Sequence, residues 1–148
     1  MPCDLVILGK DLDIDAFLAK TKLHGFTRIY KGEPRFKSKP EGRKVEHSRI
    51  AIETSKADFD ELDKQIKDTI RYLKTHKEKL SYINQVKEVD LALLDFGINL
   101  RIDKKKVLLQ SDRFPAELLR LAGEIGLDIE LSIYPIDMGA MLGKNKQE

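Results

Sequence analysis

The sequence has 148 residues but only one cysteine, Cys3, and no tryptophan. A single cysteine excludes an internal disulfide bond and a metal site built from cysteines alone. Structural disulfides belong to oxidising compartments, so their absence fits a reducing one. We therefore expect a cytoplasmic protein.

A long hydrophobic segment is also lacking. The apolar run at residues 5–8 has no basic residues before it and ends at Gly9. It is too short for the hydrophobic part of a signal peptide or for a membrane span. We expect an unprocessed, soluble chain with no membrane among its partners.

Charged residues are plentiful, but the two signs nearly cancel. Lysine and arginine number 27 and aspartate and glutamate 25, a balance that favours solubility over general binding of polyanions. Residues 31–44 depart from this balance with a net charge of +4, which leaves −2 for the remainder. The positive residues of this segment are Lys31, Arg35, Lys37, Lys39, Arg43 and Lys44, and its negative residues are Glu33 and Glu41.

Motifs for metals, cofactors and nucleophiles are incomplete in this sequence. Residues 11–22 begin with the alternating aspartates of a calcium loop, but Ala16 and Lys22 stand where that loop needs Gly and Glu. Residues 139–145 resemble a phosphate loop with one residue too few between its glycines. No two histidines have metal-binding spacing, and no GxSxG nucleophile motif is present. We expect no metal, cofactor or catalytic residue, and the sequence favours a non-enzymatic protein without settling the question.

The longest helical pattern covers residues 55–85. Ser55 and Asp58 have the spacing of a capping box, which predicts a helix that starts there. The pattern lapses at residues 75–77, which predicts either a bend or a second short helix from about residue 77 to residue 85. The apolar residues that recur at steps of three and four are Phe59, Leu62, Ile66, Ile70 and Leu73. This helix is predicted to cover a sheet.

A continuous apolar run ended by Gly9 predicts a buried strand at residues 5–8, and alternating polar and apolar residues predict most of the others. We expect strands at residues 5–8, 26–30, 47–54, 89–93, 98–102 and 128–134, with a bend at 95–97 and a hairpin that turns residues 98–102 back onto 107–109. Shorter helices are expected between residue 14 and Gly25, and from Pro115 to Gly126.

Clean alternation indicates a sheet with one solvent-facing side. The prediction is an α+β fold whose mainly antiparallel sheet has helices on one face, close to a ferredoxin-like arrangement with an added strand and helix. We expect one domain at residues 1–136 and a flexible tail at 137–148. The predicted core residues are Leu62, Ile66, Ile70, Ile129, Leu131 and Ile133.

Several short motifs accompany this order of elements. Gly9-Lys10-Asp11 precedes the first helix, Lys31-Gly32-Glu33 follows the second strand, and Gly126 separates the closing helix from the strand Ile129 to Tyr134. In these features most of the chain resembles a bacterial family of small domains of unknown function. That family has no established activity or site residues to carry over. The resemblance implies at most that the chain binds other proteins, as toxin-neutralising immunity proteins do.

The basic segment and its root form the candidate binding site. Glycines and prolines should prevent regular pairing there, which predicts a long mobile loop. Phe36 is its only interior aromatic residue, whereas proteins that bind single-stranded nucleic acids interleave several, so an acidic protein surface is the favoured partner over nucleic acid. The candidate binding residues are Arg28, Tyr30, Lys31, Arg35, Lys37, Lys39 and Arg43.

These observations favour a non-enzymatic protein-binding module, of the immunity type or another interaction type. The alternative is a small hydrolase or ligand-binding domain with a cleft near residues 28–47, using Arg28, Tyr30 or His47. The segment could also be an inert solvated connector. The sequence leaves homo-oligomerisation and the identity of the partner open.

Overall fold

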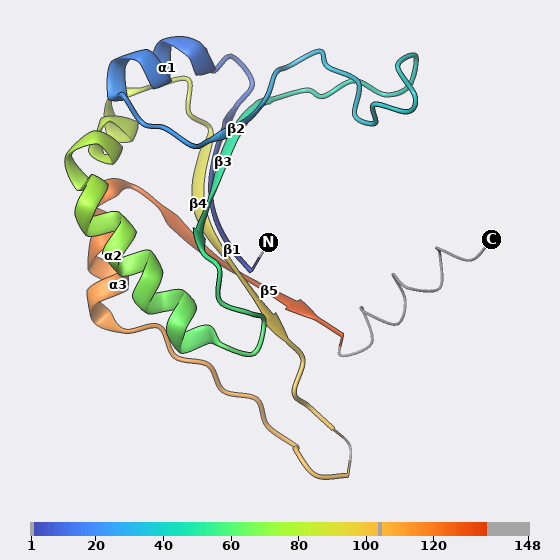
Figure 1. The fold of residues 1–148 in the computed structure, drawn as a ribbon, viewed down its shortest axis with the longest axis vertical. Coiled ribbons are helices and arrows are strands. Elements are labelled where there is room, and N and C mark those ends of the chain that lie inside the picture. The colour runs from blue at the N-terminus through green and yellow to red at the C-terminus, as the bar shows by residue number, and fades with distance from the viewer. Residues whose placement is uncertain (1, 104, 136–148) are drawn as a thin grey trace.

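The computed structural model describes residues 2–103 and 105–135. Their strands form one five-stranded sheet in the order β2-β3-β1-β4-β5, and their three α-helices all lie on the same side of it (Figure 1). The strands are β1 (Cys3–Gly9), β2 (Thr27–Ile29), β3 (Ser48–Ser55), β4 (Leu91–Asn99) and β5 (Asp128–Tyr134). The helices are α1 (Ile14–Thr21), α2 (Leu62–Leu80) and α3 (Ala116–Ile125), and the 3₁₀ turn η1 (Ser81–Gln85) follows α2.

The sheet is mixed, with antiparallel pairing dominant. Strand β1 pairs antiparallel with both β3 and β4, and β2 pairs antiparallel with β3. Strands β4 and β5 are parallel because α3 crosses between them. The predicted α+β fold with helices on one face is confirmed, but the ferredoxin-like arrangement is not. The expected tail at 137–148 and the glycine-containing stretch at 139–145 lie outside the described residues.

One hydrophobic core fills the space between the sheet and the helices. Ile66 of α2 is 4% exposed, as predicted, and it packs in a cluster with side chains from β1, β4 and α3. Leu62, Ile70, Ile129 and Leu131 are partly buried against the same cluster. The prediction for Ile133 is wrong, because this side chain is 51% exposed. Strand β5 lies at the sheet edge, and its end runs past the helices (Figure 1).

Helix α2 begins seven residues later than the capping-box pattern predicts. Ser55 belongs to β3, and its Oγ donates to Asp68 Oδ2 (2.7 Å) while it accepts the N–H of Ala57 (3.1 Å). The capping prediction is wrong because strand pairing with Cys3 holds Ser55 in extended backbone. The interruption predicted at residues 75–77 is absent, because α2 continues to Leu80, and only the 3₁₀ turn η1 follows it within the predicted range.

The bend predicted at residues 95–97 is also absent. Strand β4 continues through Gly97, whose N–H donates to the carbonyl of Pro2 and whose carbonyl accepts from Gln65 Nε2 (2.9 Å). A Cβ at Gly97 would lie 2.9 Å from the ring of Phe59. Glycine is therefore needed here for close packing inside a strand, which the sequence pattern cannot distinguish from a turn.

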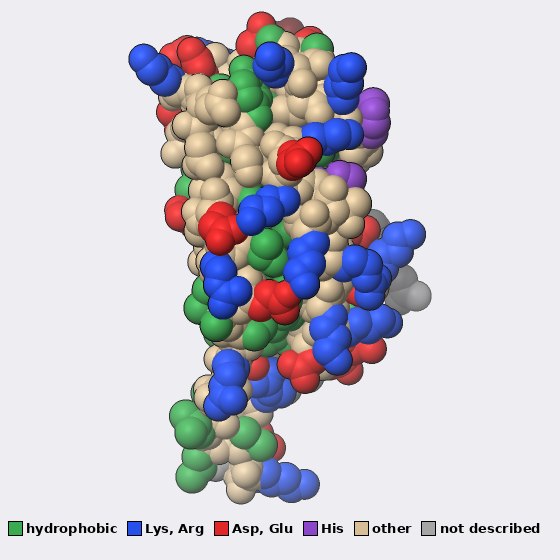
Figure 2. All heavy atoms as spheres, turned by 90° about the vertical axis from the view of Figure 1, so that its left-hand side faces the viewer, with side chains coloured by type: hydrophobic (Ala, Val, Ile, Leu, Met, Phe, Trp, Pro, Cys, Tyr) green, Lys and Arg blue, Asp and Glu red, His purple; other side chains and the backbone are tan. Residues whose placement is uncertain are grey.

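The segment between β4 and α3 is a protruding loop. Asp103 and Val107 pair through two backbone hydrogen bonds, which confirms the predicted turn, although the strand itself ends at Asn99. Leu108 and Leu109 are 83% and 79% exposed. Figure 2 shows the helical side of the molecule, where positive and negative side chains are mixed and hydrophobic side chains gather on this loop.

Within residues 2–103 and 105–135, no helix combines the length and the hydrophobicity that crossing a membrane requires.

Candidate binding site on the open face of the sheet

The basic segment lies in an arm formed by residues 31–47 between β2 and β3. Gly32 N–H donates to Val45 O, Val45 N–H to Glu33 O, and Arg35 N–H to Arg43 O, at 2.8 to 2.9 Å. The glycines and prolines of this segment were predicted to prevent regular pairing. Pro34 nevertheless stands opposite Lys44 in one isolated bridge, at a position between these hydrogen bonds where no N–H from proline is needed. The two sides of the arm are therefore joined by a few backbone hydrogen bonds and one isolated bridge, while the regular strands stop at Ile29 and resume at Ser48, as the glycines and prolines predicted.

The arm projects away from the sheet on the side opposite the helices (Figure 1). We call that side of the sheet the open face. Side chains at alternate positions of the central strands point to it, and Val6, Ala51 and Leu93 form a small apolar cluster there with Leu8 and Leu91. The arm thus borders one end of a partly apolar surface.

A cleft of about 560 Å³ lies where the arm meets the open face. Its apolar side chains are partly buried, and they come from two strands and from both sides of the arm. Cations surround them. The apolar lining residues are Leu8, Ile29, Pro34 and Val45, the cationic ones are Arg35, Lys37, Arg43, Lys44 and Arg49, and Glu33, Glu46 and His47 complete the set. This combination suits a ligand with both apolar and negatively charged groups.

The structure separates the candidate binding residues into two groups. Arg35, Lys37 and Arg43 line the cleft. Arg28 and Tyr30 instead reach Asp15 of α1, with Arg28 Nη1 at 3.0 Å and Tyr30 Oη at 2.8 Å from the same carboxylate oxygen. Alternation along β2 explains the division, because Arg28 pairs with the buried Ile50 and so points to the helical face.

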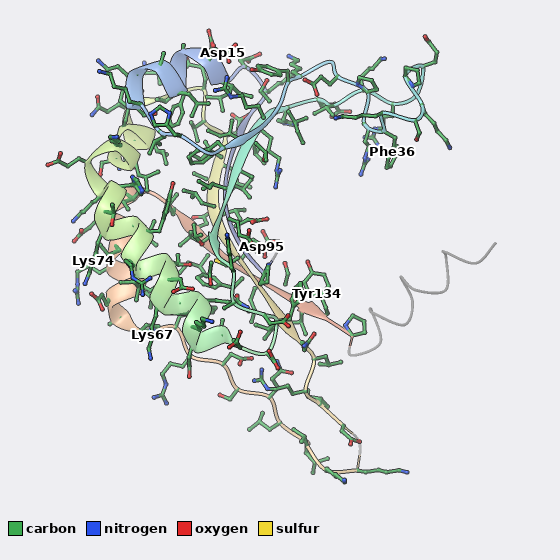
Figure 3. All side chains as sticks on the ribbon, in the orientation of Figure 1. Asp15, Phe36, Lys67, Lys74, Asp95 and Tyr134 are labelled. Carbon is green, nitrogen blue, oxygen red and sulfur yellow. The ribbon has the colours of Figure 1, made fainter. Side chains whose placement is uncertain are left out.

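The two remaining candidates lie outside this cleft. Lys31 forms an ion pair with Asp11 at 3.5 Å, and Lys39 lies farther along the arm. Near it, the ring of Phe36 is 61% exposed, with the guanidinium of Arg35 at 5.9 Å from its centroid. In Figure 3, Phe36 extends from the arm, on the same side of the molecule as the open face.

A row of carboxylates that the sequence pattern does not reveal crosses the open face. Asp4 of β1 pairs in register with Glu53 of β3 and with Asp95 of β4, and Asp95 pairs with Glu130 of β5. We call these four residues the carboxylate row. Asp4, Glu53 and Asp95 are each the only carboxylate within their strand, and only the strand order and register place the four side by side.

Burial and the neighbouring negative charges of the carboxylate row disfavour the ionised form of Asp4. Burial raises the pKa of Asp4, and the neighbouring Glu53 and Asp95 raise it further while Arg49 opposes them. Asp4 Oδ1 is buried and has no hydrogen-bond partner within the described residues. Asp95 Oδ1 accepts from Ser132 Oγ at 2.6 Å. Like charges directly opposite in a sheet are destabilising, so this row would be stabilised by an external cation or donor.

A model of the family named Domain of unknown function (DUF4279) matches residues 1–135. The chain belongs to the DUF4279 family. This membership confirms the resemblance to a family of unknown function, but it confirms neither a bacterial source nor an immunity function. No curated protein and no solved structure matches the chain.

Cys3 of this DUF4279 chain is held in a buried polar cluster. Its Sγ lies 3.3 Å from Thr69 Oγ1 and 3.1 Å from Thr54 Oγ1, and the two threonine hydroxyls are 2.8 Å apart. Burial raises the pKa of the thiol to about 11. A thiol that stays protonated at neutral pH is a poor nucleophile, so this cluster has the properties of a structural element.

Metal ligands are not clustered within the part of the chain that the structure describes. No group of three histidine, cysteine, aspartate or glutamate side chains there could hold a metal ion. The carboxylates of the row are spread over four strands at the ordinary strand spacing, roughly 4.8 Å, instead of converging on one point. The cleft and the carboxylate row are thus two charged surfaces of opposite sign on one face.

Proposed function

We propose that this DUF4279 protein is a non-enzymatic protein-binding module whose cleft binds an acidic, partly apolar surface of a protein partner. The observation that carries the proposal is the lining of the cleft, where apolar side chains are surrounded by arginine and lysine. An immunity-type interaction, as the family resemblance suggests, would be one instance of this function.

The apolar and cationic residues would contribute in different ways. Burial of apolar surface stabilises a complex by about 25 cal/mol per Å² before the costs of association are subtracted. Exposed cations mainly raise the association rate and select acidic partners. Their field is screened over ~8 Å at physiological ionic strength, so binding should weaken as salt increases.

A labelled peptide of alternating glutamate and leucine is a direct probe of this proposal. Lys37→Glu changes the cleft, whereas Lys67→Glu makes the same substitution at an exposed lysine of α2 (Figure 3). Fluorescence anisotropy should show about three- to tenfold weaker binding for Lys37→Glu, because an exposed charge pair contributes up to about 1 kcal/mol. Lys67→Glu should bind as the wild type does.

The reversal of Arg35, Lys37, Lys39 and Arg43 to glutamate gives a stronger version of the test. All four side chains are exposed, so the variant should keep its fold, and it should bind the peptide more slowly. A folded variant that associates at the wild-type rate and salt dependence would show that the arm is an inert connector.

The cleft volume favours a second candidate, the binding of a small amphipathic anion. About 560 Å³ lies within the roughly 300–1,000 Å³ range of small-molecule sites. Decanoate is a suitable probe, and a rise in Tm with decanoate but not with the peptide would favour this alternative. Among the described lining residues His47 could act as a base, but no serine, threonine or cysteine accompanies it, which disfavours the hydrolase hypothesis.

A further inference from the structure

The open face carries charges of opposite sign at its two ends. Arg49 lies near the arm and Glu53 lies in the carboxylate row, four residues farther along β3. At about 3.3 Å per residue, the two ends are separated by about 13 Å. Between them lies the apolar cluster around Val6, Ala51 and Leu93. Along the strands, the open face is therefore positively charged at the end near the arm, apolar in the middle and negatively charged at the carboxylate row.

We propose that the acidic partner is a second copy of this chain, docked open face to open face about a twofold axis. The axis would lie across the strands at the level of the apolar cluster. A half-turn about it places the arm and Arg49 of each copy at the level of the other's carboxylate row, with Arg49 facing Glu53 along β3. This inference rests on the proposed function, because it identifies the acidic surface that the cleft binds.

Charge complementarity favours this arrangement over a parallel one. A twofold interface brings the same patch of both subunits together, so it needs a surface that is complementary to itself after rotation. On β3 the rotation pairs Arg49 with the partner subunit's Glu53, and the symmetric contact pairs Glu53 with the partner subunit's Arg49. If the strands of the two facing sheets ran in the same direction, the four carboxylates of one copy would instead lie against those of the other.

The arms would complete each interface. The flat part of a five-stranded sheet of this length covers roughly 400 Å², while stable interfaces bury about 800 Å² per partner. The arm projects from the open face (Figure 1), so it can extend past the edge of a facing sheet. Phe36, the exposed aromatic residue on the arm, is then available to contact the partner.

Sedimentation equilibrium of the wild-type protein tests the inference without substitutions. We expect a dimer at micromolar concentration and an ionic strength of about 0.01 M, and dissociation towards the monomer at about 1 M, where the Debye length falls from ~30 Å to ~3 Å. A wild-type protein that remains monomeric at high micromolar concentration and low salt would overturn the inference. If that monomer still binds the glutamate-leucine peptide, the proposed function stands without it.

Charge exchange tests the geometry. Arg43→Glu/Arg49→Glu reverses two charges of the basic end, and Glu53→Lys/Glu130→Lys brings the carboxylate row from four negative charges to a net charge of zero. Each variant alone should dimerise at least about a hundredfold more weakly than the wild type, because symmetry repeats every substitution in the second contact. Mixing the two should restore a dimer that contains one copy of each, since the substituted positions that face each other, such as Arg49→Glu and Glu53→Lys, are again of opposite sign.

Circular dichroism and Tm establish that both variants are folded, and Lys67→Glu serves as the control that should dimerise normally. Mixed variants that are folded but stay monomeric would contradict the facing-sheet arrangement. The same conclusion follows if either variant alone dimerises as tightly as the wild type.

Discussion

Gly126 and Gly123 lie three residues apart, but only one of the two positions needs glycine. Gly126 ends α3 with φ +92°, and a Cβ there would lie 2.3 Å from Asn84 Oδ1. Gly123 lies inside the same helix, is exposed, and a Cβ there would meet nothing within 4 Å. Only the first position needs glycine, because L-residues rarely adopt this conformation.

Alanine substitution should therefore change stability in opposite directions at these two positions. Gly126→Ala should lower the free energy of unfolding by about 1 kcal/mol or more, from the left-handed backbone and the contact with Asn84. Gly123→Ala should raise it by up to about 1 kcal/mol, because alanine has the higher helix propensity. Urea titration of the two variants measures both effects, and equal effects at both positions would contradict this account of the helix end.

The Asp4 carboxylate should make stability depend on pH. Burial and neighbouring carboxylates raise its pKa above the ordinary 3.8, so the folded chain binds more protons than the unfolded chain between these two values. Stability from this residue therefore falls as pH rises through that window, and the penalty is complete above it. Asp4→Asn removes the charge and should stabilise the monomer near pH 7, with the gain lost below about pH 3.8.

Thermal unfolding at low protein concentration, where the monomer prevails, measures this gain. Asp128→Asn is a suitable control, because Asp128 is an exposed aspartate at the start of β5 and should change the Tm little. A gain from Asp4→Asn that is the same at acidic and neutral pH would show that packing rather than charge is responsible.

At the scale of elements, α2 and β5 cover the core to different extents. Ile66 on α2 is 4% exposed and Ile133 near the end of β5 is 51% exposed, although both patterns predicted core positions. Ile66→Ala should lower the free energy of unfolding by roughly 2–5 kcal/mol, because it removes buried methyl groups and leaves a cavity. Ile133→Ala should lower it by less than about 1 kcal/mol. Chemical denaturation gives both values, and a cost below about 1 kcal/mol for Ile66→Ala would contradict the role of α2 as the cover of the core.

Periodicity identified the elements better than their ends. The strand Asp128–Tyr134 and the end of α3 at Gly126 were predicted correctly, since alternation and helix termination are local properties. The start of α2 was not, because Ser55 is also the last residue of a paired strand. Likewise, Gly97 in a strand and Gly in a turn look the same until the facing ring of Phe59 is known.

At the scale of the whole molecule, the sequence predicted the basic part of the candidate site but not its acidic part. The charge of residues 31–44 is a property of composition, and three of the predicted residues, Arg35, Lys37 and Arg43, do line the cleft. The carboxylate row depends instead on pairing between residues about 50 and 90 positions apart, such as Asp4 with Glu53 and Asp95. Register of this kind is set by the tertiary structure, so a single sequence does not contain it in readable form.

The position of β1 in the middle of the sheet has a consequence for biosynthesis. This strand leaves the ribosome first, yet one of its two neighbours, β4, begins only at Leu91. At 5–20 residues per second the nascent chain waits on the order of ten seconds for that neighbour. During this interval β1 and β3 can pair, but the other edge of β1 exposes its backbone N–H and C=O groups. Strand β1, the central strand of the finished sheet, is thus an unpaired sheet edge during this part of translation.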